Sequence, residues 1–428
     1  MIRSLIPFIL LAAISIESSL ASELALDPFI HTEAAAYQDD EIAATQDQVL
    51  SFIPGYILDL RFDSFSLYSK IAYRFDSFDA KRDIWYYGEN YLEWQDTKGL
   101  ISLSAGLQRL QLGSLDIFQS VDLINDNIAD SYVSDIARQG YPMMSFKYFG
   151  ETSKFSLYYL PYFITPYYPA NSARMGLGLQ FDQQLLIDSN GERYESKSAY
   201  QQYGFKFDDS TESVDFTLGY FHIADRSLSF IQIDPAILLT RFFFETDLFF
   251  MNMQWTIAET IIKANLFHKQ YPTLNYSIND ASLGTIETSG PKDHTMAGVG
   301  IENKWQIIKG HDTTLLIEYQ RILGVSQSAA NRYNVFANDI AWGVRHQFND
   351  SSSKQLQLVN IIDLSHAEEQ IFQIDYRQNI TDPLKFSIGL RLIEAQTRDD
   401  QTLGFDSLNG LTIVDDADTI YSTLSYIF

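Results

Sequence analysis

Large apolar residues occupy every second position in many short stretches of this chain, with small or polar residues between them. In LKFSIGLRL at 384–392, leucine, phenylalanine and isoleucine share one parity, whereas lysine, serine, glycine and arginine share the other. The stretches FSLYSKIAYRF at 65–75 and IAWGVRHQF at 340–348 repeat the pattern. Because successive side chains of a strand point to opposite faces, the pattern predicts strands with one apolar and one polar face.

Such stretches recur along the whole chain and predict eighteen strands, with sixteen as the alternative. The expected strands lie at 28–37, 50–61, 64–75, 84–95, 100–110, 141–149, 154–164, 198–207, 213–223, 246–256, 260–269, 296–307, 313–322, 337–348, 354–364, 369–379, 383–394 and 418–428. The last one ends on Phe428. An even number of strands can close into an antiparallel ring.

The lengths of the connections separate a membrane barrel from a soluble sandwich, which would also alternate. Tight links alternate with long ones at 111–140, 165–197, 224–245, 270–295, 323–336 and 395–417. Transmembrane barrels have short turns at one end and long loops at the other. We therefore expect an all-β transmembrane antiparallel barrel closed by the C-terminal strand.

The N-terminus predicts a secretory signal peptide at 1–21. Arg3 precedes an apolar stretch at 5–16, and the small residues Ser19 and Ala21 follow it. This stretch is too short to span a bilayer as a helix. Residues 22–428 then form a single barrel domain, and the absence of cysteine excludes disulfides and a lipoprotein anchor.

Composition narrows the class of protein further. The chain has 55 acidic and 30 basic residues, a net charge of −25, and 14% aromatic residues. Nucleic acid is an improbable partner for such a charge. With the signal, the even strand count, the aromatic content and the terminal YIF, the sequence resembles Gram-negative outer-membrane porins. The resemblance implies export to the outer membrane of a Gram-negative bacterium.

A local stretch strengthens this resemblance. QLGSLDIFQSVDLIND at 111–126 is similar to a segment of porin-like and alginate-export-like barrels, with Gly113, Asp116, Phe118, Asp122 and Asn125 at the matching places. The porin resemblance implies that the third loop, 111–140, folds inward and narrows the pore. We expect the constriction residues to be Asp116, Asp122, Asp126 and Arg138.

The polar parity of the strands predicts a net basic lumen in an acidic protein. The expected pore-lining basic ladder comprises Lys70, Arg74, Lys263, Lys304, Arg345, Arg377, Lys385 and Arg391. Inward acids, Glu302, Glu318 and Asp375 among them, are fewer, and much acidity lies in the outer loops. A basic wall favours anions. The interpretation is a channel for small anionic solutes; if the basic residues pair with acids across strands, the pore is only weakly selective.

Two other classes of function stay open. A structural or adhesive barrel would use its acidic loops to hold lipopolysaccharide through divalent cations. A rim-located hydrolase would use His222 with Asp225 or His366 with Glu368, although no HExxH or GxSxG motif supports catalysis. We expect no enzyme activity, cofactor or metal site. We expect the C-terminal strand to bind the barrel-assembly machinery, and a monomer is weakly favoured over a trimer.

Overall fold

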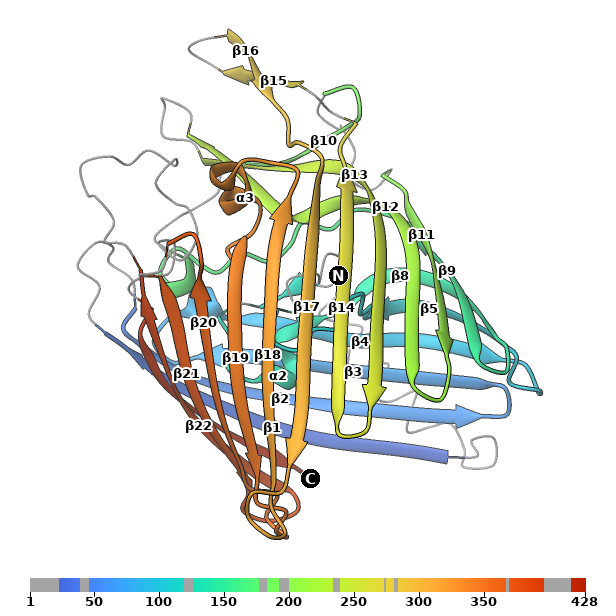
Figure 1. Ribbon diagram of the computed structural model, residues 1–428, viewed down its shortest axis with the longest axis vertical. Coiled ribbons are helices and arrows are strands. Elements are labelled where there is room, and N and C mark those ends of the chain that lie inside the picture. The colour runs from blue at the N-terminus through green and yellow to red at the C-terminus, as the bar shows by residue number, and fades with distance from the viewer. Residues whose placement is uncertain are drawn as a thin grey trace.

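The computed structural model describes residues 23–38, 46–118, 126–128, 130–176, 183–191, 200–233, 239–272, 275–280, 284–366, 369–395 and 417–428. These residues form a closed antiparallel barrel of eighteen strands (Figure 1). The predicted signal peptide at 1–21 lies outside the described residues.

Each strand of the ring pairs with the next ring strand along the chain. The ring strands are β1 (Glu23–Tyr37), β2 (Gln48–Phe62), β3 (Phe65–Asp76), β4 (Ile84–Gln95), β5 (Ile101–Gln108), β8 (Tyr141–Phe149), β9 (Ser153–Leu160), β11 (Gln202–Ser210), β12 (Val214–Ile233), β13 (Leu239–Ile257), β14 (Thr260–Gln270), β17 (His294–Trp305), β18 (Asp312–Leu323), β19 (Asn338–Gln347), β20 (Gln355–Asp363), β21 (Gln370–Asn379), β22 (Leu384–Glu394) and β23 (Thr419–Ile427). β23 pairs with β1 and closes the ring. The count of eighteen strands is confirmed over the alternative of sixteen.

Smaller elements lie in the connections. They are the strands β6 (Asp126–Asn127), β7 (Arg138–Gln139), β10 (Gln183–Ile187), β15 (Asn275–Asp280) and β16 (Gly284–Ser289), and the short helices η2 (Ala80–Arg82), α2 (Ser134–Ala137), η3 (Arg174–Gly176) and α3 (Gln327–Tyr333). Among the described helices, none is long and apolar enough to cross a membrane.

The two ends of the barrel differ as the sequence predicts. Short turns such as 63–64 and 258–259 join strands at one end, and long segments such as 109–140 and 161–201 join them at the other. Asp63 and Ala258 hold the tight turns with positive φ angles of 46° and 50°. We refer to these as the short-turn end and the long-loop end.

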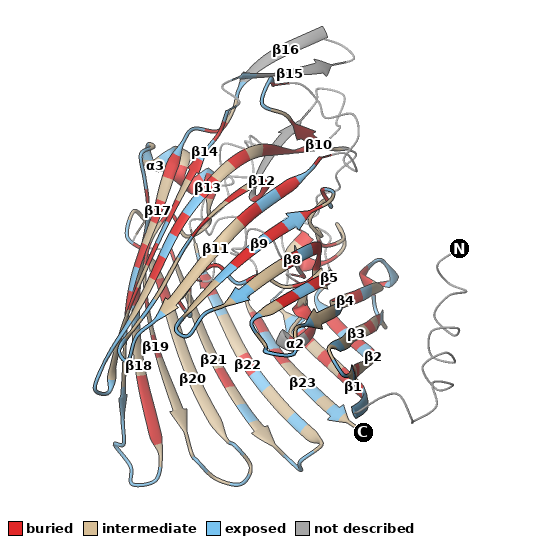
Figure 2. Ribbon diagram, turned by 90° about the vertical axis from the view of Figure 1, so that its right-hand side faces the viewer, coloured by how far each residue is buried: buried red, intermediate tan, exposed pale blue. Residues whose placement is uncertain are grey.

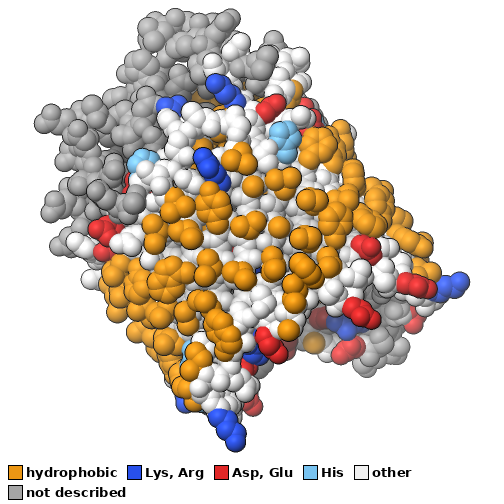
Figure 3. All heavy atoms as spheres, viewed as in Figure 1, with side chains coloured by type: hydrophobic (Ala, Val, Ile, Leu, Met, Phe, Trp, Pro, Cys, Tyr) orange, Lys and Arg blue, Asp and Glu red, His pale blue; other side chains and the backbone are white. Residues whose placement is uncertain are grey.

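The apolar parity faces outward. Phe65, Leu103, Leu157, Met251 and Val299 are among many large apolar side chains that are exposed on the strands, and buried and exposed residues alternate along them (Figure 2). In Figure 3, hydrophobic side chains cover the middle of the barrel face, and charged ones gather mainly towards its margins. A surface of this kind suits a lipid bilayer.

Several predicted strand boundaries are wrong, and two places show the reason. The loop expected at 224–245 is mostly strand, because β12 runs to Ile233 and β13 begins at Leu239. Phe242, Phe243 and Phe244 are buried on both faces of β13, and β10 pairs in parallel with this part of the strand. Apolar residues covered on both faces do not alternate with polar ones, which hid this strand from the pattern. β9 ends at Leu160, just before Pro161, which cannot donate to a ladder.

Candidate pore constriction

Residues 109–140 connect β5 and β8, and we refer to them as the inner loop. Their described parts, 109–118, 126–128 and 130–140, lie against the inner wall of the barrel. The first limb, 109–118, lies along the inner wall formed by β13, β14, β17 and β18. The Ser114 hydroxyl donates to Asn265 at 2.6 Å, and the Asn252 amide donates to the Leu112 carbonyl. Leu115 fills the space above Gly298 and Gly300 of β17, where a side chain would collide with it.

A single carboxylate fixes the turn of this limb. Glu318 of β18 accepts hydrogen bonds from the backbone N–H groups of Asp116, Ile117 and Phe118 at 2.7, 2.9 and 2.9 Å. Glu318 is fully buried. Hydrogen bonds to a charged acceptor contribute about 1.5–3 kcal/mol each, so Glu318 is a strong attachment point.

Asp116 adds an ion pair to the same attachment. Its carboxylate accepts from Lys263 Nζ at 2.6 Å, and Lys263 also donates to Glu302 at 3.0 Å. Arg345 reaches the other Glu302 oxygen at 3.4 Å. Three of the predicted lumenal charges therefore neutralise one another at the loop.

The second limb of the inner loop, 126–140, is held on the other side of the ring. Asp130 receives Arg74 Nη2 at 3.1 Å and Arg82 Nε at 3.2 Å. Glu33 of β1 accepts from the backbone N–H of Tyr132 at 2.9 Å and lies 3.6 Å from both arginines. All four charged residues are buried. The two described limbs of the inner loop are thus attached to different parts of the inner wall.

Burial also affects the one tyrosine of this limb that faces the wall. Burial raises the pKa of Tyr132 above its ordinary value. The hydroxyl donates to Tyr37 of β1, and the ring stacks on Tyr421 of β23 with centroids 4.6 Å apart. These contacts place the limb beside β23.

A cavity of about 520 Å³ separates the second limb from the wall of β20–β23. Four basic residues line it: Arg138 from the loop, and Arg377, Lys385 and Arg391 from the strands. Among the described residues that line it, the only acid is Asp375, which is buried and accepts from the Tyr421 hydroxyl. The cavity wall is therefore net basic.

The strand register keeps these cations unneutralised. Across the ladders, Arg377 faces Gln355 and Ser387, Lys385 faces Asn379 and Ser425, and Arg391 faces Gln373 and Thr419. Within the described part of the chain, no ion pair joins Arg377, Lys385 or Arg391 to an acid. Cross-strand pairing, the alternative left open by the sequence, thus applies to Lys263 and Arg345 but not to this wall.

The other predicted site residues fall into three groups. Lys70 faces inward with its Nζ 6.0 Å from the Phe29 ring, and Lys304 pairs with Asp312 at 2.8 Å near the short-turn end. Arg74 and Lys263 face inward but are buried, so they anchor the inner loop and do not line open water. Asp122 and the side chain of Asp126 lie outside the described residues.

Sequence reasoning missed several attachment residues. Glu33 of β1 and Glu318 of β18 stand at inward-facing positions of their strands. The alternation that places them there cannot show that a loop binds them. Arg82 and Asp130 lie in connections, where no strand pattern applies. Arg82 lies outside the strands, so its burial and its contacts are seen only in the three-dimensional structure.

Of the two histidine pairs expected for a hydrolase, His222 with Asp225 does not form. His222 faces outward and contacts Asp247 at 2.9 Å and Glu245 at 3.3 Å. Asp225 instead faces inward and binds Lys269 at 2.8 Å, because successive strand residues alternate between the faces and residues 222 and 225 differ in parity. Glu368 lies outside the described residues, and His366 lies 3.7 Å from Asp363.

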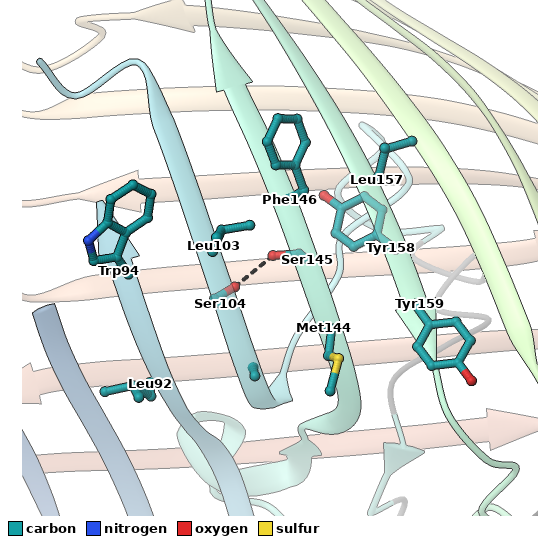
Figure 4. A pocket seen from close by; sticks show the side chains of 11 residues that line it. Leu92, Trp94, Leu103, Ser104, Met144, Ser145, Phe146, Leu157, Tyr158 and Tyr159 are labelled. Atoms are coloured by element: carbon teal, nitrogen blue, oxygen red, sulfur yellow. Dashed lines mark hydrogen bonds between the residues drawn. The ribbon is translucent and has the colours of Figure 1, made fainter. Parts of the chain in front are cut away.

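A second cavity, of about 470 Å³, lies on the outward face of β4, β5, β8 and β9. Figure 4 shows its rim of Leu92, Trp94, Leu103, Met144 and Leu157, with the Ser104–Ser145 hydrogen bond at its base. The exposed apolar residues of its rim belong to the face suited to lipid. This cavity is therefore no part of the lumenal path.

Solved structures that are similar to this chain include three bacterial proteins. OccK8 (OprE) of Pseudomonas aeruginosa has a TM-score of 0.50 and 8% identity, covering 96% of this chain and 99% of its own. A triple mutant of a Rhodopseudomonas blastica porin has a TM-score of 0.42 and 12% identity, covering 95% and 100%. The loop L8 deletion mutant of OmpT, an outer membrane protein of Vibrio cholerae, has a TM-score of 0.43 and 10% identity, covering 95% and 99%. No protein-family model and no curated sequence matches the chain. The chain has the fold of a porin-like outer-membrane barrel.

The attachment of Leu115 leads to a first prediction. A leucine at Gly298 would occupy the space of Leu115, since even a Cβ there lies 2.6 Å from Leu115 Cδ1. We expect Gly298→Leu to displace the first limb and to make single-channel current larger and noisier. Gly343→Ala is the control, because its added Cβ finds ordinary contacts at 3.4 Å or more. Equal currents from both variants would show that Leu115 does not position the loop.

Proposed function

We propose that this protein is an outer-membrane channel that lets small anionic solutes diffuse passively through the lumen. One observation carries the proposal: the second limb of the inner loop and the strand wall enclose a cavity whose wall presents Arg377, Lys385 and Arg391. An anion that passes beside cations without acidic partners has a lower energy there than in bulk water. A pore of this kind needs no enzyme activity and no cofactor.

The proposal includes a location and partners. The exposed apolar band fits the outer membrane of a Gram-negative bacterium, reached by export with a signal peptide at 1–21. The final strand would be recognised by the barrel-assembly machinery. Lipopolysaccharide phosphates would be bridged to the acidic outer loops by divalent cations.

A non-conducting structural barrel is the second candidate, and the attachments of the inner loop favour it. Both limbs are fastened to the wall by buried charges, as a plug would be. The two candidates differ in ion flow alone, because they share fold and location.

Reconstitution of the mature chain in a planar bilayer tests the proposal. We expect stable current steps and, across a potassium chloride gradient, a zero-current potential with the sign of chloride selectivity. A refolded sample without conductance would favour the structural barrel. A cation-selective potential would show that the acidic outer loops, and not the cavity wall, control passage.

A further inference from the structure

Three potential metal ligands meet at the long-loop end of β20 and β21, and a fourth carboxylate lies opposite one of them on β19. We name them the mouth cluster: Asp339, Asp363, His366 and Glu369. Asp339 and Asp363 are direct cross-strand partners in the β19–β20 ladder. Ligand atoms of Asp363, His366 and Glu369 lie within 4.8 Å of one another.

The turn after β20 builds this arrangement. Asp363 Oδ1 accepts from the backbone N–H groups of Ser365 at 2.6 Å and His366 at 3.0 Å. The N–H of Glu369 donates to the His366 carbonyl at 2.8 Å, and the N–H of Asp363 donates to the Glu369 carbonyl at 3.1 Å. These bonds bring residues three and six positions apart onto one site and leave Asp363 Oδ2 facing His366.

Burying these carboxylates without a bound cation raises the free energy of the folded protein. Asp339, Asp363 and Glu369 are 0%, 1% and 3% exposed. Asp339 Oδ1, Asp363 Oδ2 and His366 Nδ1 are buried atoms with no hydrogen-bond partner. Within the described ranges, no lysine or arginine forms an ion pair with Asp339 or Asp363. Like charges directly opposite in a ladder repel each other, and buried unpaired charges are unfavourable.

A cation held by Asp363, His366 and Glu369 would satisfy Asp363 Oδ2 and His366 Nδ1 at once, and its charge would offset that of Asp339 on the neighbouring strand. We propose that the mouth cluster binds one divalent transition-metal ion, with Zn²⁺ as the representative. Carboxylate oxygens together with an imidazole nitrogen suit Zn²⁺, whereas Ca²⁺ and Mg²⁺ prefer oxygen ligands alone. The inward parity of Asp339 and Asp363 places the ion on the lumen side of the wall.

The site adjoins the attachment of the inner loop. Ala341 and Ile361 form the pair that follows Asp339 and Asp363 on the inner face, and Phe118 packs on both. A bound ion would hold β19, β20 and β21 together where the first limb rests. The metal would therefore stabilise the part of β19 and β20 on which the first limb packs, whichever solute the pore conducts.

Sequence analysis expected no metal site, although the spacing was visible. Asp363, His366 and Glu369 follow one another at intervals of three within DLSHAEE. Asp339 lies on another strand, and only the ladder register brings it opposite Asp363.

Metal binding by the refolded mature protein tests the proposal. After treatment with a chelator, we expect isothermal titration to show one Zn²⁺ per chain and urea unfolding to shift to a higher midpoint with Zn²⁺. Asp363→Asn and His366→Ala should each weaken binding by about tenfold or more. Asp382→Asn, which removes an exposed acid from a short turn, is the charge-matched control and should bind Zn²⁺ as the parent does.

Asp339→Asn separates a metal site from an unliganded charge cluster. Without metal it should unfold at a higher urea concentration than the parent, because repulsion with Asp363 is removed, and it should lose the stabilisation by Zn²⁺. Less than one Zn²⁺ per chain, or equal affinity in Asp363→Asn and Asp382→Asn, would overturn the proposal. Full binding by His366→Ala with equal preference for Ca²⁺ would overturn the mixed ligand set.

Discussion

Reversing two charges on the cavity wall is expected to invert the ion selectivity of the pore. Lys385→Glu combined with Arg391→Glu replaces two of the four cations around the cavity by anions. A unit charge about 8 Å from a passing ion contributes about 0.5 kcal/mol at the dielectric constant of water and about 2 kcal/mol at an effective value of about 20. Reversing one charge changes this energy by twice the contribution of a unit charge, and reversing two changes it by about four times that contribution, so the zero-current potential should change sign.

The control is a double variant that changes the net charge by the same amount but lies away from the cavity. Lys98 and Lys309 are exposed in short turns outside the cavity, and Lys98→Glu with Lys309→Glu should leave the sign of the potential unchanged. Selectivity should also weaken with ionic strength, because salt screens charges beyond about 10 Å at 0.1 M. If both double variants shift the potential equally, net charge and not the cavity wall determines selectivity.

The strands were predictable because their signal is local. Alternation needs only the residues of one strand, so the ranges of β4 and β8 agree with the prediction at both ends. The pattern failed at β13, where Phe242, Phe243 and Phe244 are buried on both faces, and at Pro161, where the ladder loses a donor. Each failure lies where packing or backbone chemistry overrides the period of two.

The sequence predicted which charged side chains face the lumen, but not which contacts they make there. Parity placed Lys263, Glu302 and Arg345 on the inner face, where the structure has them in one network. It could not show that Asp116 joins them, since that contact joins residues 147 positions apart. The attachment of the inner loop to Glu318 spans 200 to 202 positions. Long-range contacts of an irregular segment leave no periodic signal in the sequence.

Releasing the second limb of the inner loop is expected to enlarge the pore. Asp130→Ala leaves the buried guanidinium groups of Arg74 and Arg82 with fewer carboxylates. Removing one partner of a buried ion pair costs about 3–5 kcal/mol, which corresponds to a change of about 100-fold or more in the docked population. The strand ladders lose no hydrogen bond, so the barrel should stay folded while the limb leaves its wall.

Single-channel conductance and liposome swelling with neutral sugars of increasing size measure the release. We expect higher conductance and passage of larger sugars through Asp130→Ala. Asp350→Asn is the control, since it breaks an ion pair with Lys354 in a short turn at 3.0 Å, and exposed pairs of this kind contribute little to stability. If the parent is closed and Asp130→Ala conducts, the inner loop is a plug and the structural barrel is correct. If both variants behave as the parent does, the buried network around Asp130 does not hold the constriction.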